Sequence, residues 1–213
     1  MYKISRRTLL WSPVWIFLIW ATFASAPPMS VSVPSGAWTR NFHAKGKDLT
    51  QVLLFSGNYF SLTEHESGSG AFVSTKGGSW KRSGKKMTMT LEFDTADSTK
   101  VGSSLTVRLK QKGNMLHWQD SSGPALTWNA ADGGNATPLT GPWLFAGRKG
   151  DNGQISRREP DQPRKTMKLL SNSRFQWIAY NTETKQFFGT GGGTYPAKDG
   201  KYIETIGFFS RDN

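Results

Sequence analysis

Glu204 is the residue whose type and place in the sequence most suggest chemistry. It lies between Tyr202 and Ile206 in an alternating run, so its side chain is expected on the apolar face of a strand. An isolated buried carboxylate is very costly and must be paired or solvated. Glu204 is therefore either the polar anchor of a ligand pocket or the structural partner of an arginine such as Arg174.

Other motifs that resemble functional sites have simpler structural explanations. Glu64 and His65 are adjacent in a predicted strand, so Glu64 points inward, His65 points outward, and a polar strand end is expected. The run Gly191 to Gly193 lacks the following helix of a phosphate-binding loop and predicts a glycine bulge. The three histidines (His43, His65 and His117) fall on separate predicted strands. We therefore assign no metal site, cofactor or catalytic residue, and leave enzyme activity open.

A cluster of basic residues marks one polar loop. Six cations lie in this segment: Arg148, Lys149, Arg157, Arg158, Arg164 and Lys165. With a net charge of +12 and a pI of about 10.0, the chain favours anionic surfaces. The loop is either simply solvated or forms an anion-binding lip over a barrel mouth, for acidic glycans or lipid head groups, with Arg148, Lys149, Arg157 and Arg158 as its candidate residues.

Short alternating runs separated by turn residues predict an all-β fold. No segment after the N-terminal region has the apolar spacing of a helix. Eight strands are expected in the first part: Trp38 to His43, Gln51 to Ser56, Tyr59 to His65, Ala71 to Lys81, Lys86 to Phe93, Ser103 to Gln111, Met115 to Asp120 and Ala125 to Trp128. Their connection by hairpins predicts an antiparallel barrel or meander.

The chain also contains an internal repeat. Residues 54 to 98 align without a gap with residues 169 to 213 at an offset of 115 and share eleven identities. We predict a first barrel over 36–128, a flexible linker over 129–140 and a second, incomplete copy over 141–213. Trp38 and Trp143 are expected at equivalent buried positions, and Tyr202 to Phe209 is expected to leave an open strand edge through which the chain self-associates.

The second copy resembles a known family. The segments Lys168 to Ile178, Phe188 to Tyr195 and Gly200 to Asn213 are similar to a lipocalin-like family of secreted Bacteroidetes proteins, to our knowledge without an established activity. The resemblance implies two tandem lipocalin-like β-barrels, the second truncated.

The function expected from this fold is binding of a small apolar or amphipathic ligand. The candidate residues are bulky side chains predicted to face a barrel interior: Phe60, Leu62, Phe72, Phe175, Trp177, Phe187, Tyr202 and Glu204. The alternative is a surface protein that binds anionic glycans or lipid head groups through its basic loops.

The N-terminus predicts export. Lys3, Arg6 and Arg7 precede an apolar run from Leu9 to Phe23 of about fifteen residues, and Ala24 to Ala26 fits a cleavage site. We expect residues 1–26 to be a signal peptide or, because Pro27 disfavours cleavage, an N-terminal anchor. The protein would then be periplasmic, extracellular or membrane-associated in a Gram-negative bacterium, where nucleic acid is not an expected partner.

Overall fold

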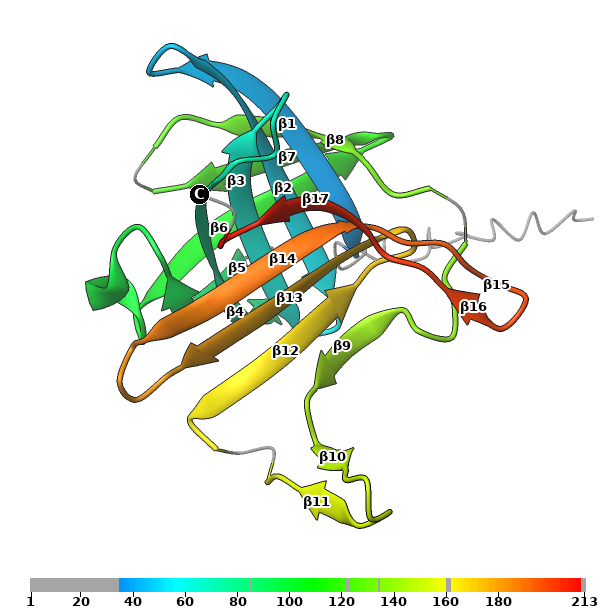
Figure 1. Cartoon of the computed structure of the whole chain (residues 1–213). Helices are drawn as coiled ribbons and strands as arrows, with labels where there is room; N and C mark the ends of the chain where they lie inside the picture. The colour runs from blue at the N-terminus through cyan, green and yellow to red at the C-terminus, as the bar shows by residue number, and fades with distance from the viewer. Residues whose placement is uncertain (1–34, 85, 122, 134, 160–161, 212–213) are drawn as a thin grey trace, which may run out of the picture. The chain divides into compact units, whose positions relative to one another are not determined.

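The alternating residues between Gly36 and Ala130 form eight antiparallel strands that close into a barrel (Figure 1). The strands follow one another around the barrel, and β8 pairs with β1 to close it. Their bounds are β1 (Gly36–Ala44), β2 (Lys47–Ser56), β3 (Tyr59–Glu66), β4 (Phe72–Ser83), β5 (Lys86–Asp94), β6 (Ser104–Lys112), β7 (Met115–Asp120) and β8 (Leu126–Ala130). A 3-10 turn, η1 (Ser98–Lys100), precedes β6. The predicted all-β class is confirmed.

This computed structural model describes residues 35–84, 86–121, 123–133, 135–159 and 162–211, all within one unit of the chain, residues 32–213. The predicted signal peptide lies outside the described residues. Within them, no helix is long and apolar enough to cross a membrane.

Aromatic and apolar side chains form a core inside the barrel. Each strand of the barrel contributes at least one buried residue to this core: Trp38, Leu53, Phe55, Phe60, Trp80, Met87, Met89, Leu91, Val107, Leu116, Trp118 and Trp128. Burial of each large apolar side chain contributes about 1.5–3 kcal/mol to the free energy of unfolding.

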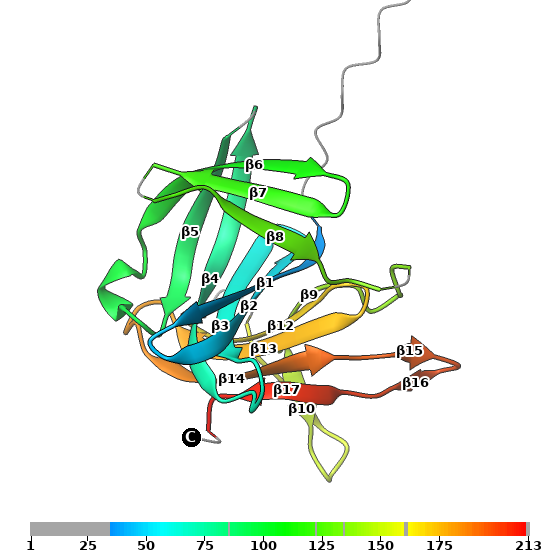
Figure 2. The ribbon, with the colours of Figure 1, turned by 90° about the horizontal axis from the view of Figure 1, so that it is seen from above.

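The remaining strands form a second sheet that does not close. Five strands pair in the order β17-β14-β13-β12-β9 (Figure 2). Their bounds are β9 (Gly141–Leu144), β12 (Arg164–Leu170), β13 (Arg174–Asn181), β14 (Phe187–Thr194) and β17 (Thr205–Phe209). Two small hairpins extend from this sheet: β10 (Gly147–Lys149) with β11 (Ile155–Arg157), and β15 (Ala197–Lys198) with β16 (Lys201–Tyr202).

The second sheet has the same strand register as the first five barrel strands. Leu53 pairs with Leu62 across β2 and β3, and Lys168 pairs with Trp177 across β12 and β13, each 115 residues later. The bulges also coincide, since each of the two in the barrel recurs 115 residues on: Glu64/His65 with Ala179/Tyr180, and Gly77/Gly78 with Gly192/Gly193.

The glycines at these bulges allow a close approach of neighbouring strands. A Cβ at Gly193 would lie 1.9 Å from the carbonyl oxygen of Thr205, and one at Gly78 would lie 2.2 Å from that of Thr90. Any side chain at either position would therefore push the paired strand away. This agrees with the prediction of a glycine bulge rather than a phosphate site.

One face of the second sheet packs against the outside of the barrel through pairs of aromatic rings. The Phe72 and Phe187 rings stack with centroids 6.4 Å apart, and these two residues are themselves 115 apart. Two further pairs cross between barrel and sheet: His65 with Phe208 at 5.5 Å and Phe93 with Tyr180 at 5.0 Å. His65 corresponds to Tyr180, and Phe93 corresponds to Phe208, at the offset of 115 residues. Both pairs therefore join the same two positions of the repeat, and the position that the barrel supplies in one pair is supplied by the sheet in the other.

Asp132, in the segment predicted as a linker, joins the barrel to the second sheet. Its carboxylate accepts hydrogen bonds from the Ala37 backbone N–H at 3.0 Å and from the Ser171 hydroxyl at 2.6 Å. It also accepts hydrogen bonds from the backbone N–H and the hydroxyl of Ser173, both at 3.0 Å. One carboxylate thus links β1 to the turn between β12 and β13.

Candidate functional site

The barrel interior contains two of the predicted ligand-binding residues. Phe60 is buried in the core, and Leu62, two residues further along β3, packs against it while remaining partly exposed. Both side chains point inward, as the alternation predicts.

A row of polar side chains continues from these residues on the inner face of three neighbouring strands. Arg40 of β1 pairs with Gln51 of β2, which pairs with Glu64 of β3. Partners in an antiparallel register share a face, and Gln51 lies two residues from core residue Leu53, so the row faces the interior. Gln51 Nε2 donates a hydrogen bond to Glu64 Oε2 at 2.8 Å.

Aromatic rings hold the Arg40 guanidinium in the barrel. Its central carbon lies 4.6 Å from the ring centroid of Phe42 and 5.8 Å from that of Trp128, distances at which a cation is attracted to the ring face. Trp128 is 1% exposed. The polar row therefore lies against the aromatic core of the barrel.

Several buried polar atoms in and near this row of side chains have no hydrogen-bond partner among the described residues. They include Arg40 Nε, Gln51 Oε1 and the indole nitrogen of Trp128. The indole nitrogens of Trp38 and Trp80 are also without a partner. A buried donor without an acceptor costs about 1–3 kcal/mol. We call Arg40, Gln51, Glu64 and Trp128 the polar row site.

Two predicted interior residues lie elsewhere. Phe72 and Phe187 stack on each other between the barrel and the second sheet. The bulge at Glu64/His65 shifts the alternation by one residue, so Phe72 pairs with outward-facing His65. The same bulge recurs in the pairing of β13 with β14 and turns Phe187 toward the barrel surface. Phe72 and Phe187 are therefore not residues of a barrel interior.

The other predicted residues belong to the second sheet and its β15/β16 hairpin, and this sheet does not close into a barrel. Phe175 and Trp177 lie on the face of β13 turned away from the barrel, and Trp177 pairs there with Lys168. Lys168 occupies the register position at which the barrel has Leu53. A charged residue at this core position disfavours closure of the sheet.

Glu204 is paired on that open face. Lys168 Nζ donates a hydrogen bond to Glu204, and the Tyr202 hydroxyl donates to Glu204 Oε1 at 2.6 Å. The pKa of Tyr202 is raised by burial and by the neighbouring Glu204 carboxylate. The structural partner of Glu204 is thus a lysine, and Arg174 instead donates from Nε to the Ala131 carbonyl oxygen at 3.2 Å.

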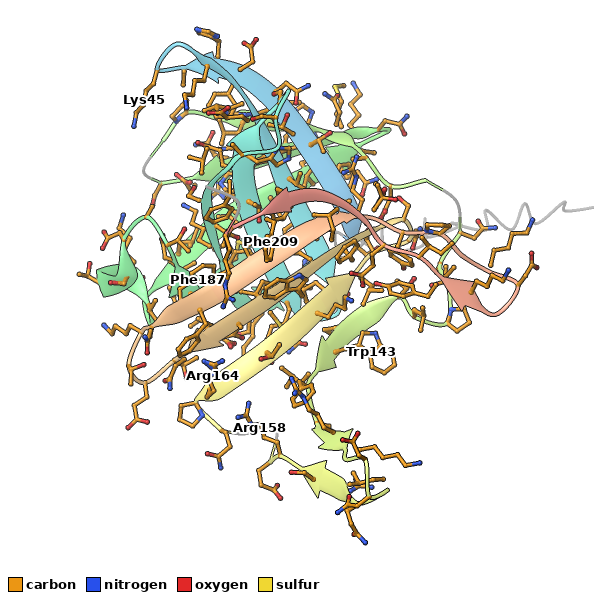
Figure 3. The ribbon with its side chains drawn as sticks, viewed as in Figure 1. Lys45, Trp143, Arg158, Arg164, Phe187 and Phe209 are labelled. Atoms are coloured by element: carbon orange, nitrogen blue, oxygen red, sulfur yellow. The ribbon has the colours of Figure 1, made fainter. Side chains whose placement is uncertain are left out.

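Trp143 corrects the expectation of two equivalent buried tryptophans. It has the register position of Trp38, but it is 51% exposed, whereas Trp38 is 3% exposed. Figure 3 shows Trp143 on β9, at the edge of the second sheet. It is exposed because the sheet does not close around it.

The basic loop forms a hairpin on the second sheet. Arg148, Arg157 and Arg158 line an open hollow of about 500 Å³ on β10 and β11, together with Phe145 and Glu159. The predicted fourth residue, Lys149, is exposed on β10 but does not line the hollow. The hairpin is a separate two-stranded sheet that follows β9, a strand of the second sheet and not of the barrel.

Arg40 and Gln51 are functional candidates that sequence reasoning missed. Glu64 was expected to point inward, but its neighbours across the sheet depend on strand register, which cannot be read from one strand. The signal for Arg40 was its spacing of two from Trp38 in a predicted strand.

The described residues contain no group of three His, Cys, Asp or Glu side chains placed to hold a metal ion. The chain matches no protein-family model, and comparisons with curated proteins and with solved structures also found no match.

Proposed function

We propose that this chain is an exported, lipocalin-like binding protein whose barrel accepts the polar head group of a small amphipathic ligand at the polar row site. The resemblance noted in the sequence supports the lipocalin-like class, and the closed eight-stranded barrel is compatible with it. Such barrels hold side chains or one small ligand.

The observation that carries this proposal is the set of unpaired buried donors beside Arg40. A ligand oxygen that accepts hydrogen bonds from Arg40 Nε and from the Trp128 indole would remove the cost of leaving them unpaired. Partly buried leucines of the interior would contact the apolar part of the ligand: Leu62, Leu105, Leu109 and Leu126.

Titration with dansyl-labelled undecanoic acid tests the proposal. We expect saturable 1:1 binding, seen as dansyl fluorescence excited through the interior tryptophans. Arg40→Gln should weaken binding about 10- to 100-fold, because a hydrogen bond from a charged group contributes about 1.5–3 kcal/mol.

Arg108→Gln is the matched control. Arg108 is exposed on β6 and alternates with the inward residue Val107, so its loss should leave the dissociation constant unchanged. Absence of saturable binding, or an Arg40→Gln variant that binds as tightly as wild type, would refute the proposal.

We also infer that the second sheet is a copy of the first five barrel strands. The identical register and the two coincident bulges at an offset of 115 support this, together with the sequence identities. Bulges are local features that tend to persist within a family.

A second candidate function is binding of anionic glycans or lipid head groups through the β10/β11 hairpin. The convergence of Arg148, Arg157 and Arg158 on one hollow favours it, although Glu159 offsets part of the charge. We expect retention on a heparin column that falls with salt, and a substantial loss of retention when the three arginines are changed to glutamine. Equal loss in a variant with Lys110, Lys112 and Arg108 changed to glutamine would argue against a specific site.

A further inference from the structure

The contact between the barrel and the second sheet contains a partly buried carboxylate on one side. Glu92, the extra residue of the β5 bulge, accepts hydrogen bonds from the Tyr180 hydroxyl at 2.8 Å and from Lys165 Nζ at 3.0 Å. The Glu92 side chain is only 13% exposed. A carboxylate is thus an integral part of this half of the contact.

The same position on the other half lacks a carboxylate. Gly207 stands 115 residues after Glu92 and is likewise the extra residue of its bulge, in β17. His65 stands where the other half has Tyr180. Both replacements shorten the side chain, so they leave space at the position that the Glu92 carboxylate fills on the other side.

A pocket occupies that space. It has a volume of about 150 Å³, lies between the outer face of the barrel and the second sheet, and is lined by both polar and apolar groups. The polar lining includes His65, Arg174 and Gln176, and Val52, Leu54 and Phe208 provide apolar walls. A cavity of this volume holds a molecule of about six heavy atoms.

The charges around the pocket favour an anion. Arg174 provides a permanent cation, and no described carboxylate lies within 4.0 Å of the guanidinium nitrogens of Arg174 or the ring nitrogens of His65. Arginine matches a carboxylate through paired hydrogen bonds. On the opposite half the cation beside the Glu92 carboxylate is Lys165, which lies on a different strand from Arg174. Both halves therefore place a cation at this position, although the residues that supply it do not correspond.

We propose that the pocket lined by His65, Arg174, Gln176 and Gly207 binds a small monocarboxylate in the position that Glu92 fills on the other half of the molecule. This goes beyond the proposed barrel function. The pocket lies outside the barrel, so either site can fail its test without affecting the other.

Titration with sodium acetate, exchanged for chloride at constant ionic strength, tests the proposal by NMR. We expect saturable 1:1 shifts of the His65 ring and Arg174 guanidinium signals. Arg174→Gln should weaken acetate binding at least tenfold, while inorganic phosphate should bind at least tenfold more weakly than acetate to the wild type.

Gly207→Glu is the decisive variant, because it restores the missing carboxylate within the chain. A Cβ at Gly207 would meet no atom closer than 3.7 Å, so the backbone there has room for the first carbon of a side chain. Without acetate, its His65 and Arg174 signals should resemble those of the acetate-saturated wild type, and its acetate affinity should fall at least tenfold. Gly207→Ala, which adds no charge, should bind as wild type.

The proposal is overturned if acetate causes no saturable shift, or if phosphate binds as tightly as acetate. It is also overturned if Gly207→Glu and Arg174→Gln both bind acetate as wild type. A Gly207→Glu chain that does not fold leaves Arg174→Gln as the deciding variant.

Discussion

Tyr180 is fully buried and donates its hydroxyl to Glu92, with Lys165 as the second partner of that carboxylate. Burial, reinforced by the charge of Glu92, raises the pKa of Tyr180 well above its usual value of 10.0. In the folded protein the phenol therefore stays protonated at pH values where the unfolded chain loses this proton.

This shift predicts an alkaline loss of stability. Below about pH 10 the Tyr180 phenol is protonated in both the folded and the unfolded state, so its full contribution to the free energy of unfolding is present. Above it, the unfolded state alone deprotonates, so the free energy of unfolding should fall by up to about 1.4 kcal/mol per pH unit from this group. Tyr180→Phe should cost about 1–3 kcal/mol at pH 8, because Glu92 loses a partner, and the difference from wild type should narrow above pH 10.

Urea denaturation of both proteins between pH 8 and 11.5 measures this difference. A gap between wild type and Tyr180→Phe that stays constant across the range would contradict the expectation.

At the scale of elements, the positions of the strands could be predicted from the sequence. Which side chains of a strand face the barrel interior could not always be predicted. The eight predicted strands of the barrel coincide with β1 to β8 within a few residues, because alternation and turn residues are local signals. A bulge, however, reverses the alternation, and its presence depends on pairing with another strand. That is why Phe60 and Leu62 were placed correctly while Phe72 and Phe187 were not.

The second sheet was predicted to be an incomplete copy with an open strand edge, but the role of Lys168 in it was not recognised from the sequence. Lys168 and Glu204 stand at positions where the barrel has Leu53 and Met89, each 0% exposed. Their ion pair is satisfied on an open face. The hairpin of β10 and β11 was also missed, since its short strands lie in a loop without apolar alternation.

At the scale of the whole molecule, β17 remains an edge strand with one partner in its sheet, β14. The edge is shorter than the predicted Tyr202 to Phe209, and Ala71 of the barrel bridges Phe209 at one end. Ile206, 52% exposed, lies on the uncovered part. Unpaired backbone groups on an edge favour pairing with another chain.

We therefore predict concentration-dependent self-association through β17. Ile206→Lys should shift the protein toward monomer in sedimentation velocity, because a charge on an edge strand opposes strand pairing. Ile155→Lys, at a residue 60% exposed on the β10/β11 hairpin, should not. A monomer at all concentrations, or equal effects of the two substitutions, would rule out this edge as the contact.

The second sheet and the barrel belong to one chain, and this covalent connection strengthens the packing between them. Related faces meet as in a two-fold dimer, with Phe72 against Phe187 at the centre. When two such surfaces are joined by a short connection, their association is governed by an effective concentration in the millimolar range. A contact too weak to hold two separate subunits together would then be occupied almost all the time. The segment carrying Asp132, itself bonded to both parts, sets that concentration. Lengthening it would loosen the contact between sheet and barrel without changing a residue of either surface.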